Sequence, residues 1–190
     1  MLAAFALNAM TLGIPCLYYG TEQSFDGHGS GDGADRYIRE AMFGGEFGAF
    51  ASRGKHFFDE DNAVYQELQG ILKLRGGDRI YTRGRQYLRP ISGDGVNFGL
   101  PEMIGGQILS IVPWSRLLDD QEALLAINTD LSSTKTAWVT IDASLHKPGE
   151  KLNCVYSTDD AQIGKEATVE ARNGLSVSLT VPGGGFVIFR

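Results

Sequence analysis

Hydrophobic residues recur at helical spacing in the first dozen positions of the chain. The residues that trace this face are Leu2, Phe5, Ala6 and Met10. They predict an amphipathic helix, which ends where Gly13 and Pro15 favour an extended backbone. The apolar run that follows, residues 14–19, is bounded by Gly13 and Gly20. A run of this length predicts a strand that is buried on both faces, as in a parallel α/β sheet.

A second, clearer helix is predicted between residues 59 and 77. Its apolar face comprises Val64, Leu68, Ile71, Leu72 and Leu74. Asp59 or Asp61 can cap its N-terminus, because a short carboxylate accepts hydrogen bonds from the free backbone N–H groups there. Gly76 and Gly77 end the helix. A strand, a loop and a helix in this order form one β/α unit.

After Asp78 the hydrophobic pattern changes from a helical to an alternating period. Turn signals separate the candidate strands, and Asn173-Gly174 is the sharpest of them because both residues tolerate positive φ angles. Short strands at this spacing predict an antiparallel sandwich or barrel. The candidate strands are residues 85–90, 107–113, 123–128, 136–141, 151–156, 167–171, 176–181 and 185–189.

The change of period predicts a domain boundary within residues 76–83. The β half is long enough to build its own core. The first half cannot close a (β/α)8 barrel, because such a barrel needs eight β/α units and a single unit leaves its strand with unpaired edges.

Composition excludes several classes of protein. The chain has 190 residues, 43% hydrophobic and 21% charged, and a formal net charge of −6, so it is globular and lacks the basic surface that nucleic acid requires. Residues 1–21 carry no charge, but Asn8, Gly13 and Pro15 interrupt the run, so we predict neither a membrane span nor a signal peptide. Cys16 and Cys154 are predicted to be buried thiols. The compartment, cytoplasmic or secreted, stays open.

Three segments resemble the alpha-amylase family (glycoside hydrolase family thirteen). Gly13-Ile-Pro-Cys-Leu-Tyr-Tyr-Gly-Thr-Glu-Gln23 is similar to the last barrel strand and the rim that follows it. Arg39-Glu-Ala-Met-Phe43 is similar to the next conserved stretch, with Phe43 in place of the usual Trp. Gly84-Arg-Gln-Tyr-Leu88 resembles the segment that opens the C-terminal domain. Between them, the helix at residues 59–74 is similar to the last barrel helix.

This resemblance implies a fold and a function. The expected fold is mostly β: an antiparallel β-sandwich, like the Greek-key C-terminal domain of alpha-amylases, over residues 79–190, preceded by the last β/α unit of a (β/α)8 barrel over residues 1–78. The parent enzyme would act on α-glucosidic linkages of starch-like glucans or oligosaccharides. Its catalytic carboxylates follow earlier barrel strands, so no catalytic residue is carried over to this chain. Retaining catalysis needs two carboxyl groups held about 5 Å apart by different strands, which also predicts that the chain alone is inactive.

Candidate substrate-binding residues of the parent enzyme are Tyr18, Tyr19, Glu22, Arg36 and Arg39. Tyrosine rings offer an apolar face with a polar tip, although alternation sends one of the two rings toward the core. Glu22 follows the predicted strand at the face where barrel enzymes keep their chemistry, but the family pattern favours a rim residue that pairs with a neighbouring arginine. Both arginines could orient substrate or form structural salt bridges.

Other chemistry is weakly signalled. Asp26, Asp32 and Asp35 lie in a Gly-rich loop that fails the EF-hand spacing, and the histidines, His146 among them, show no spacing for metal or base chemistry. We therefore predict no metal and no cofactor. Trp138 falls on the polar face of an alternating strand and is a candidate for glycan stacking, as is Trp114 more weakly; packing against a loop or the barrel is the alternative.

Two further hypotheses concern the chain by itself. The β half could be a carbohydrate-binding module, or it could be a structural domain that covers the upstream barrel. The apolar residues of segment 1–20 should normally be buried by barrel elements that the chain lacks, so we expect them to drive self-association, refold or lose order. These residues are Ala3, Phe5, Leu7, Leu12, Ile14 and Leu17.

Overall fold

The computed structural model describes residues 1–25, 42–43 and 58–190 of the chain. The chain divides into two compact units. The first, called here the β unit, comprises Met1–Ile14 and Leu74–Arg190, and the second, the loop–helix unit, comprises Pro15–Lys73. The division falls within helix α2 (Ala63–Gly77).

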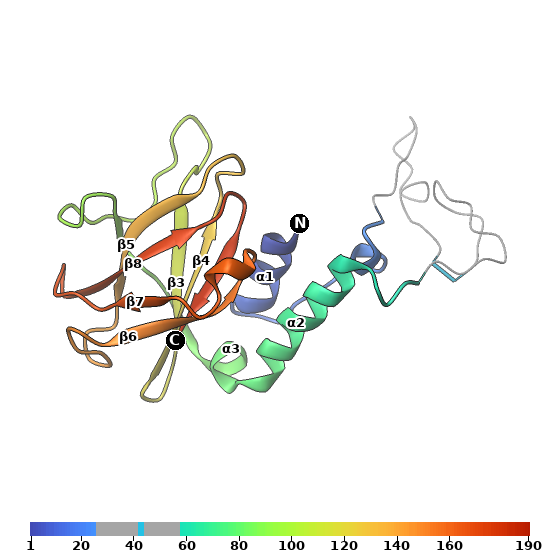
Figure 1. Ribbon diagram of the computed structural model, residues 1–190, viewed down its shortest axis with the longest axis horizontal. Coiled ribbons are helices and arrows are strands. Elements are labelled where there is room, and N and C mark those ends of the chain that lie inside the picture. The colour runs from blue at the N-terminus through green and yellow to red at the C-terminus, as the bar shows by residue number, and fades with distance from the viewer. Residues whose placement is uncertain (26–41, 44–57) are drawn as a thin grey trace. The chain divides into compact units, whose positions relative to one another are not determined.

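The β unit contains two antiparallel sheets (Figure 1). The larger sheet has the strand order β1-β3-β4-β9-β6-β7, and the smaller has the order β2-β5-β8. The strands are β1 (Arg85–Leu88), β2 (Ile91–Ser92), β3 (Ile111–Leu118), β4 (Gln121–Asn128), β5 (Lys135–Ile141), β6 (Lys151–Ser157), β7 (Glu166–Thr168), β8 (Leu175–Val181) and β9 (Phe186–Phe189).

The two sheets face each other across a hydrophobic core, which confirms the predicted sandwich. Leu124 and Val187 contribute to this core from the larger sheet, and Val139, Val177 and Leu179 contribute from the smaller one; all five are fully buried. Removing such side chains from water is the main favourable term in forming the domain.

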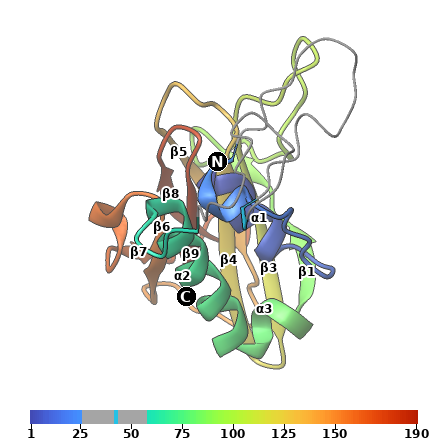
Figure 2. The ribbon, with the colours of Figure 1, turned by 90° about the vertical axis from the view of Figure 1, so that its right-hand side faces the viewer.

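The larger sheet is covered on its other face as well. Helix α1 (Leu2–Met10) packs against β9, and helix α3 (Arg79–Arg83) packs against β3 and β4 (Figure 2). Because both faces are covered, residues 123–126 are all fully buried and β9 is buried along its whole length. These strands therefore read as continuous apolar runs rather than as an alternation.

Two arginines fix the C-terminal end of α1. Arg116, buried on β3, donates to the carbonyls of Met10 (2.9 Å) and Gly84 (3.1 Å). Arg75 donates to the carbonyls of Ala9 and Gly13. The last carbonyls of a helix have no partner within the helix and carry partial negative charge, so guanidinium groups stabilise them.

The helix predictions are confirmed in extent but not in capping. Helix α2 runs to Gly77 as expected, but its cap is Asn62, whose side-chain oxygen accepts from the N–H groups of Val64 and Tyr65. The Asp59 side chain instead accepts from the N–H of Asp61. Helix α3 was not predicted; it begins at Asp78, whose carboxylate caps it and also pairs with Arg190.

The strand predicted at residues 14–19 is not formed. These residues belong to no helix or strand, and Ile14 is 95% exposed. A strand exists through its hydrogen bonds to a neighbour, and no described strand lies beside this segment. Cys16 is exposed rather than buried, whereas Cys154 is buried as predicted.

Apolar residues of segment 1–20 have two different outcomes. Ala3 and Phe5 are buried within the β unit itself. Leu12 and Ile14 stay 60% and 95% exposed. Leu7 and Leu17 are half-buried. Of the six residues expected to need covering by other elements, Leu12 and Ile14 are thus the two that are exposed.

Candidate functional site

Three of the sequence-predicted site residues meet in one groove of the loop–helix unit. Tyr18, Tyr19 and Glu22 line a cavity of about 580 Å³ together with residues of helix α2. The helix contributes Tyr65, Leu68, Gln69, Leu72 and Lys73, and Leu17 completes the wall. The lining is mostly apolar, with polar groups at a few points, as is usual for small-molecule sites.

Gly20 turns the chain sharply between Tyr19 and Glu22. Its φ is +86°, and a Cβ at this position would lie 2.9 Å from the Phe25 ring. Only glycine meets both conditions without strain. The Thr21 hydroxyl then donates to the carbonyl of Tyr18 (2.6 Å), and Thr21–Gln23 form a 3-10 turn, labelled η1, that presents Glu22.

Gln23 ties this turn to the start of helix α2. Its side-chain oxygen accepts from the Asp59 N–H (2.8 Å), and its side-chain amide donates to the Asp59 carbonyl (3.1 Å). The residue is 6% exposed. A buried amide whose two ends are both paired holds two segments at a fixed distance, so the two walls of the groove are positioned relative to each other.

Tyr19 has structural partners of its own. Its hydroxyl oxygen accepts from the N–H of Met42 (2.7 Å), and its ring meets Phe43 edge-on at 6.5 Å. The row continues through Phe58 to Tyr65, whose rings lie 5.2 Å apart. Tyr18 is 59% exposed, so of the two rings Tyr18 is the one that is more available to a ligand.

The chemistry of the groove is limited by its charges. Glu22 is the one carboxylate among its described lining residues, and Lys73 is the one cation. Glycosidic hydrolysis uses a pair of carboxyl groups on either side of the bond, so the described part of the groove supplies at most one of them. Arg36, Arg39 and the aspartates of the Gly-rich loop lie outside the described residues.

Trp138 is placed on the smaller sheet of the β unit. It is half-buried, and the Arg172 guanidinium lies over its ring at 4.3 Å from the centroid. Glu170 holds Arg172 in place (2.9 Å). A sugar that stacked on this face would first have to displace the arginine. Trp114 is 2% exposed and packs against Phe186 in the β unit.

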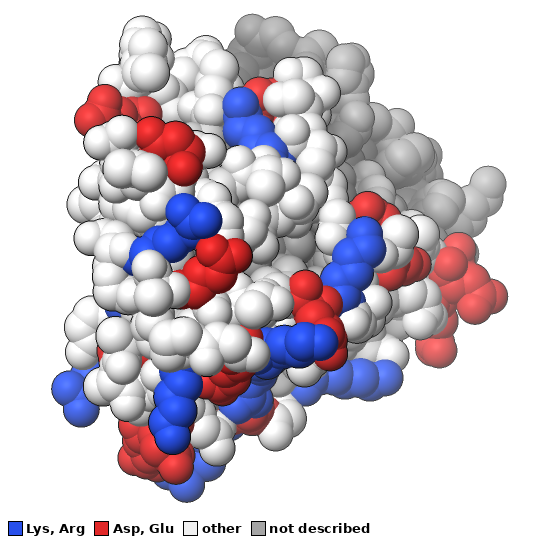
Figure 3. Space-filling model, turned by 60° about the vertical axis from the view of Figure 1, so that its left-hand side comes forward, with Lys and Arg blue, Asp and Glu red and all other residues white. Residues whose placement is uncertain are grey.

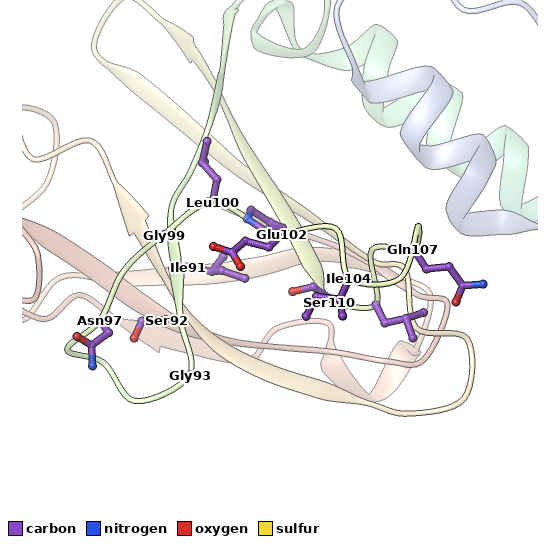
Figure 4. Close-up of a pocket in the computed structure, with 12 residues that line it drawn as sticks. Ile91, Ser92, Gly93, Asn97, Gly99, Leu100, Glu102, Ile104, Gln107 and Ser110 are labelled. Carbon is purple, nitrogen blue, oxygen red and sulfur yellow. The ribbon is translucent and has the colours of Figure 1, made fainter.

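A second cavity, of about 440 Å³, was not predicted. It is formed by residues 91–110, between β2 and β3 (Figure 4). Ile91, Leu100 and Ile104 give it apolar walls, and Glu102 and Asn97 contribute polar groups. No aromatic ring lines it, so it offers no stacking platform. Sequence reasoning missed it because most of the segment, residues 91–106, contains no predicted helix or strand.

The charge distribution agrees with the low net charge. Lys/Arg and Asp/Glu side chains are interspersed over the face drawn in Figure 3, with no extended region of one sign. Among the described residues, no group of three or more His, Cys, Asp or Glu side chains could hold a metal ion. Within the same part of the chain, no helix is long and apolar enough to cross a membrane.

Sequence comparison finds no matching protein family and no matching curated protein. Structural comparison does find similar proteins. The cyclomaltodextrin glucanotransferase CldA is 21% identical with a TM-score of 0.61, and the match covers 99% of this chain and 31% of CldA. The Nostoc punctiforme debranching enzyme is 22% identical (TM-score 0.58; 99% and 31% covered), and the alpha-amylase from H. orenii is 15% identical (0.58; 99% and 34%).

The chain thus spans about a third of the length of the structures it matches. Identities of this size carry information on the fold alone. That fold agrees with the resemblance drawn from residues 13–23, 39–43 and 84–88, because the similar structures include an alpha-amylase and each match covers nearly the whole chain. The chain therefore has the fold of the C-terminal part of alpha-amylase-type enzymes.

Proposed function

We propose that this chain is the C-terminal part of an alpha-amylase-type glycoside hydrolase that acts on α-glucosidic linkages of starch-like glucans or oligosaccharides. The observation that carries the proposal is the match of nearly the whole chain, 99%, to a third of several such enzymes. In this view residues 1–78 correspond to the end of the catalytic barrel, and residues 79–190 correspond to the C-terminal domain.

The groove between residues 17–22 and helix α2 would then be one part of a larger site. Tyr18 offers an exposed ring, and Glu22 offers a carboxylate beside it. The other carboxyl groups would come from the upstream barrel, as would most substrate contacts. By itself the chain is a structural element, and we expect no hydrolysis from it.

A titration with maltooligosaccharide, followed by NMR of both the sugar and the protein, tests the proposal. We expect no new reducing-end signals, because a single carboxylate cannot supply both the acid and the nucleophile. New reducing ends in a clean preparation would show that the chain carries a complete active site and would overturn the proposal. Sugar-dependent shifts at Trp138 without hydrolysis would favour a carbohydrate-binding module instead.

Exposed apolar residues in the N-terminal segment support a second part of the proposal. Leu12 and Ile14 are 60% and 95% exposed, and such side chains are normally covered in an intact protein. We propose that the isolated chain associates with itself through segment 1–20. Sedimentation at increasing concentration should show dimers or larger species, and a double L12S/I14S variant should remain monomeric.

A further inference from the structure

A cluster of buried ionisable side chains lies in the β unit. Glu122, on β4, has a side chain that is 1% exposed, and His146 has one that is 8% exposed. The Glu122 carboxylate contacts Arg89 (2.9 Å) and His146 (3.2 Å). It also accepts from the Ser115 hydroxyl and from the Asp142 backbone N–H (2.8 Å).

The cluster lies where the chain passes between the two sheets. Arg89 is in the connection from β1 to β2, and residues 142–150 connect β5 to β6. In each connection one strand belongs to the larger sheet and the other to the smaller. Glu122, on the larger sheet, is therefore bound to both inter-sheet connections at once.

His146 is the group whose charge decides how well the second connection is held. Its Nε2 atom lies 3.2 Å from Glu122, and its Nδ1 atom lies 3.2 Å from Glu150. A neutral imidazole has one N–H and one lone pair, so one of its nitrogens would turn a lone pair toward a carboxylate. Only the imidazolium, with an N–H on both nitrogens, attracts both carboxylates.

The surrounding charges favour the imidazolium. The groups that face His146 or its partners are the carboxylates of Glu122, Glu150 and Asp142 and the guanidinium of Arg89, which lies 3.7 Å from Asp142. Arg83 and Arg85 line a shallow pocket with Asp142 and Asp119, and Lys147 donates its backbone N–H to Glu150 (3.1 Å). With His146 neutral, Glu122 and Asp142 would share the guanidinium of Arg89, and Glu150, whose side chain is 42% exposed, would lose its contact with a cation.

We propose that His146 is a protonation-controlled latch that holds the inter-sheet connection of residues 142–150 onto β4. Protonated, it bridges Glu122 and Glu150 and keeps the connection docked. Deprotonated, it leaves one carboxylate facing a lone pair, and the connection opens locally. This inference does not depend on the proposed glucan chemistry.

The expected pH range follows from the two groups. Contact with Glu122, and then with Glu150, raises the pKa of His146 above its usual 6.5 despite burial, so its contribution is complete below pH 6.5 and is lost as pH rises through the raised value. Burial alone would raise the pKa of Glu122, but contacts with His146, Ser115 and Arg89 outweigh it and lower that pKa. Its contribution is lost as pH falls below about 4.5. The latch is therefore tightest between these limits.

NMR of the whole chain between pH 5 and pH 9 tests the latch directly. The His146 ring should titrate above 6.5. The backbone N–H of Asp142, which donates to Glu122, should exchange with solvent faster, beyond the intrinsic pH effect, once His146 is neutral, because the connection that carries it is then released from β4. A His146 ring that titrates at or below 6.5 would overturn the proposal.

Two variants separate the latch from a general loss of stability. Glu150→Gln removes the more exposed partner, whose side chain is 42% exposed, and should lower the titration midpoint of His146 while the fold is kept. Glu166→Gln is the matched control, because Glu166 pairs with Lys151 on the surface; it should leave that midpoint unchanged. His146→Gln should abolish the part of the pH dependence of Asp142 exchange that exceeds the intrinsic effect, and persistence of that excess in the variant would contradict the latch.

Discussion

Different interactions stabilise the interior of the β unit and that of the loop–helix unit. The β unit covers both faces of its larger sheet, so that residues from β4, β8 and β9 reach complete burial. Among the described residues of the loop–helix unit, only Met42, Leu68 and Ile71 are buried apolar side chains. That unit depends instead on the Gln23–Asp59 bonds and on ring contacts. A unit with a layered hydrophobic core should tolerate the loss of a single hydrogen bond. A unit that lacks such a core should depend more on each of its hydrogen bonds.

The largest effect should come from the layered core. Phe186→Ala removes a fully buried ring that packs against Trp114 and Tyr156, and we expect a loss of about 3–5 kcal/mol in the free energy of unfolding. Urea denaturation measures it. Leu72→Ala, at a 37% exposed position of the loop–helix unit, is the matched control and should cost far less; similar losses for both would contradict the comparison.

Breaking the cap of helix α1 should have the next largest effect. Arg116→Met keeps the volume but removes the donor to the carbonyls of Met10 and Gly84, for an expected loss of about 2–3 kcal/mol because those carbonyls stay buried and unpaired. Hydrogen exchange should increase first in residues 2–10. The exposed Arg85→Met is the control. Unchanged exchange in α1 would show that Arg75 alone is a sufficient cap.

The Gln23 clamp should have a smaller and local effect. Gln23→Ala removes both bonds to the Asp59 backbone, at an expected cost of about 1–2 kcal/mol. Hydrogen exchange should increase at residues 20–25 and near Asp59, while the amides of β4 keep their protection. Gln69→Ala, in the same groove, should change neither region. Loss of protection in β4 would mean that the two units unfold together.

The smallest effect should be a gain. Gly70 lies inside helix α2, and nothing lies within 4 Å of a Cβ built there. Gly70→Ala should therefore stabilise the helix by about 0.5–1 kcal/mol. Gly20→Ala is its opposite, because that position combines a φ of +86° with the close Phe25 ring. The melting temperatures of the two variants should shift in opposite directions. Shifts of the same sign would contradict the different roles given to the two glycines.

Sequence patterns predicted the β unit well because its signals are local. Asn173 and Gly174 have φ angles of +43° and +84°, as the hairpin signal required. Strand β3 was predicted over residues 107–113, but it runs from Ile111 to Leu118. In the structure Pro113 lies opposite Ala126 on β4. Strand β1 pairs with β3 only from Trp114 onward. Pro113 therefore lies just outside the part of β3 that is paired on both sides.

The residues that sequence reasoning missed depend on distant partners. Arg116 is buried because it reaches Met10, 106 positions away. His146 lies in the connection from β5 to β6, whereas its partner Glu122 lies on β4. No local sequence pattern predicts such contacts between distant residues. In the groove, Tyr18 and Glu22 could be predicted from the resemblance, but their companions on helix α2 could not, because they share no motif with them.

The bond from Arg75 to the Gly13 carbonyl, 3.0 Å long, has a consequence for engineering the protein. It joins the residues that flank Pro15–Lys73, so this segment leaves and re-enters the β unit at neighbouring points. A segment whose two ends lie close together can be replaced at small entropic cost, because the entropic cost of loop closure grows only slowly with loop length. A short Gly/Ser bridge from residue 14 to residue 74 should yield a minimal domain, with this junction as a ready place to graft other inserts.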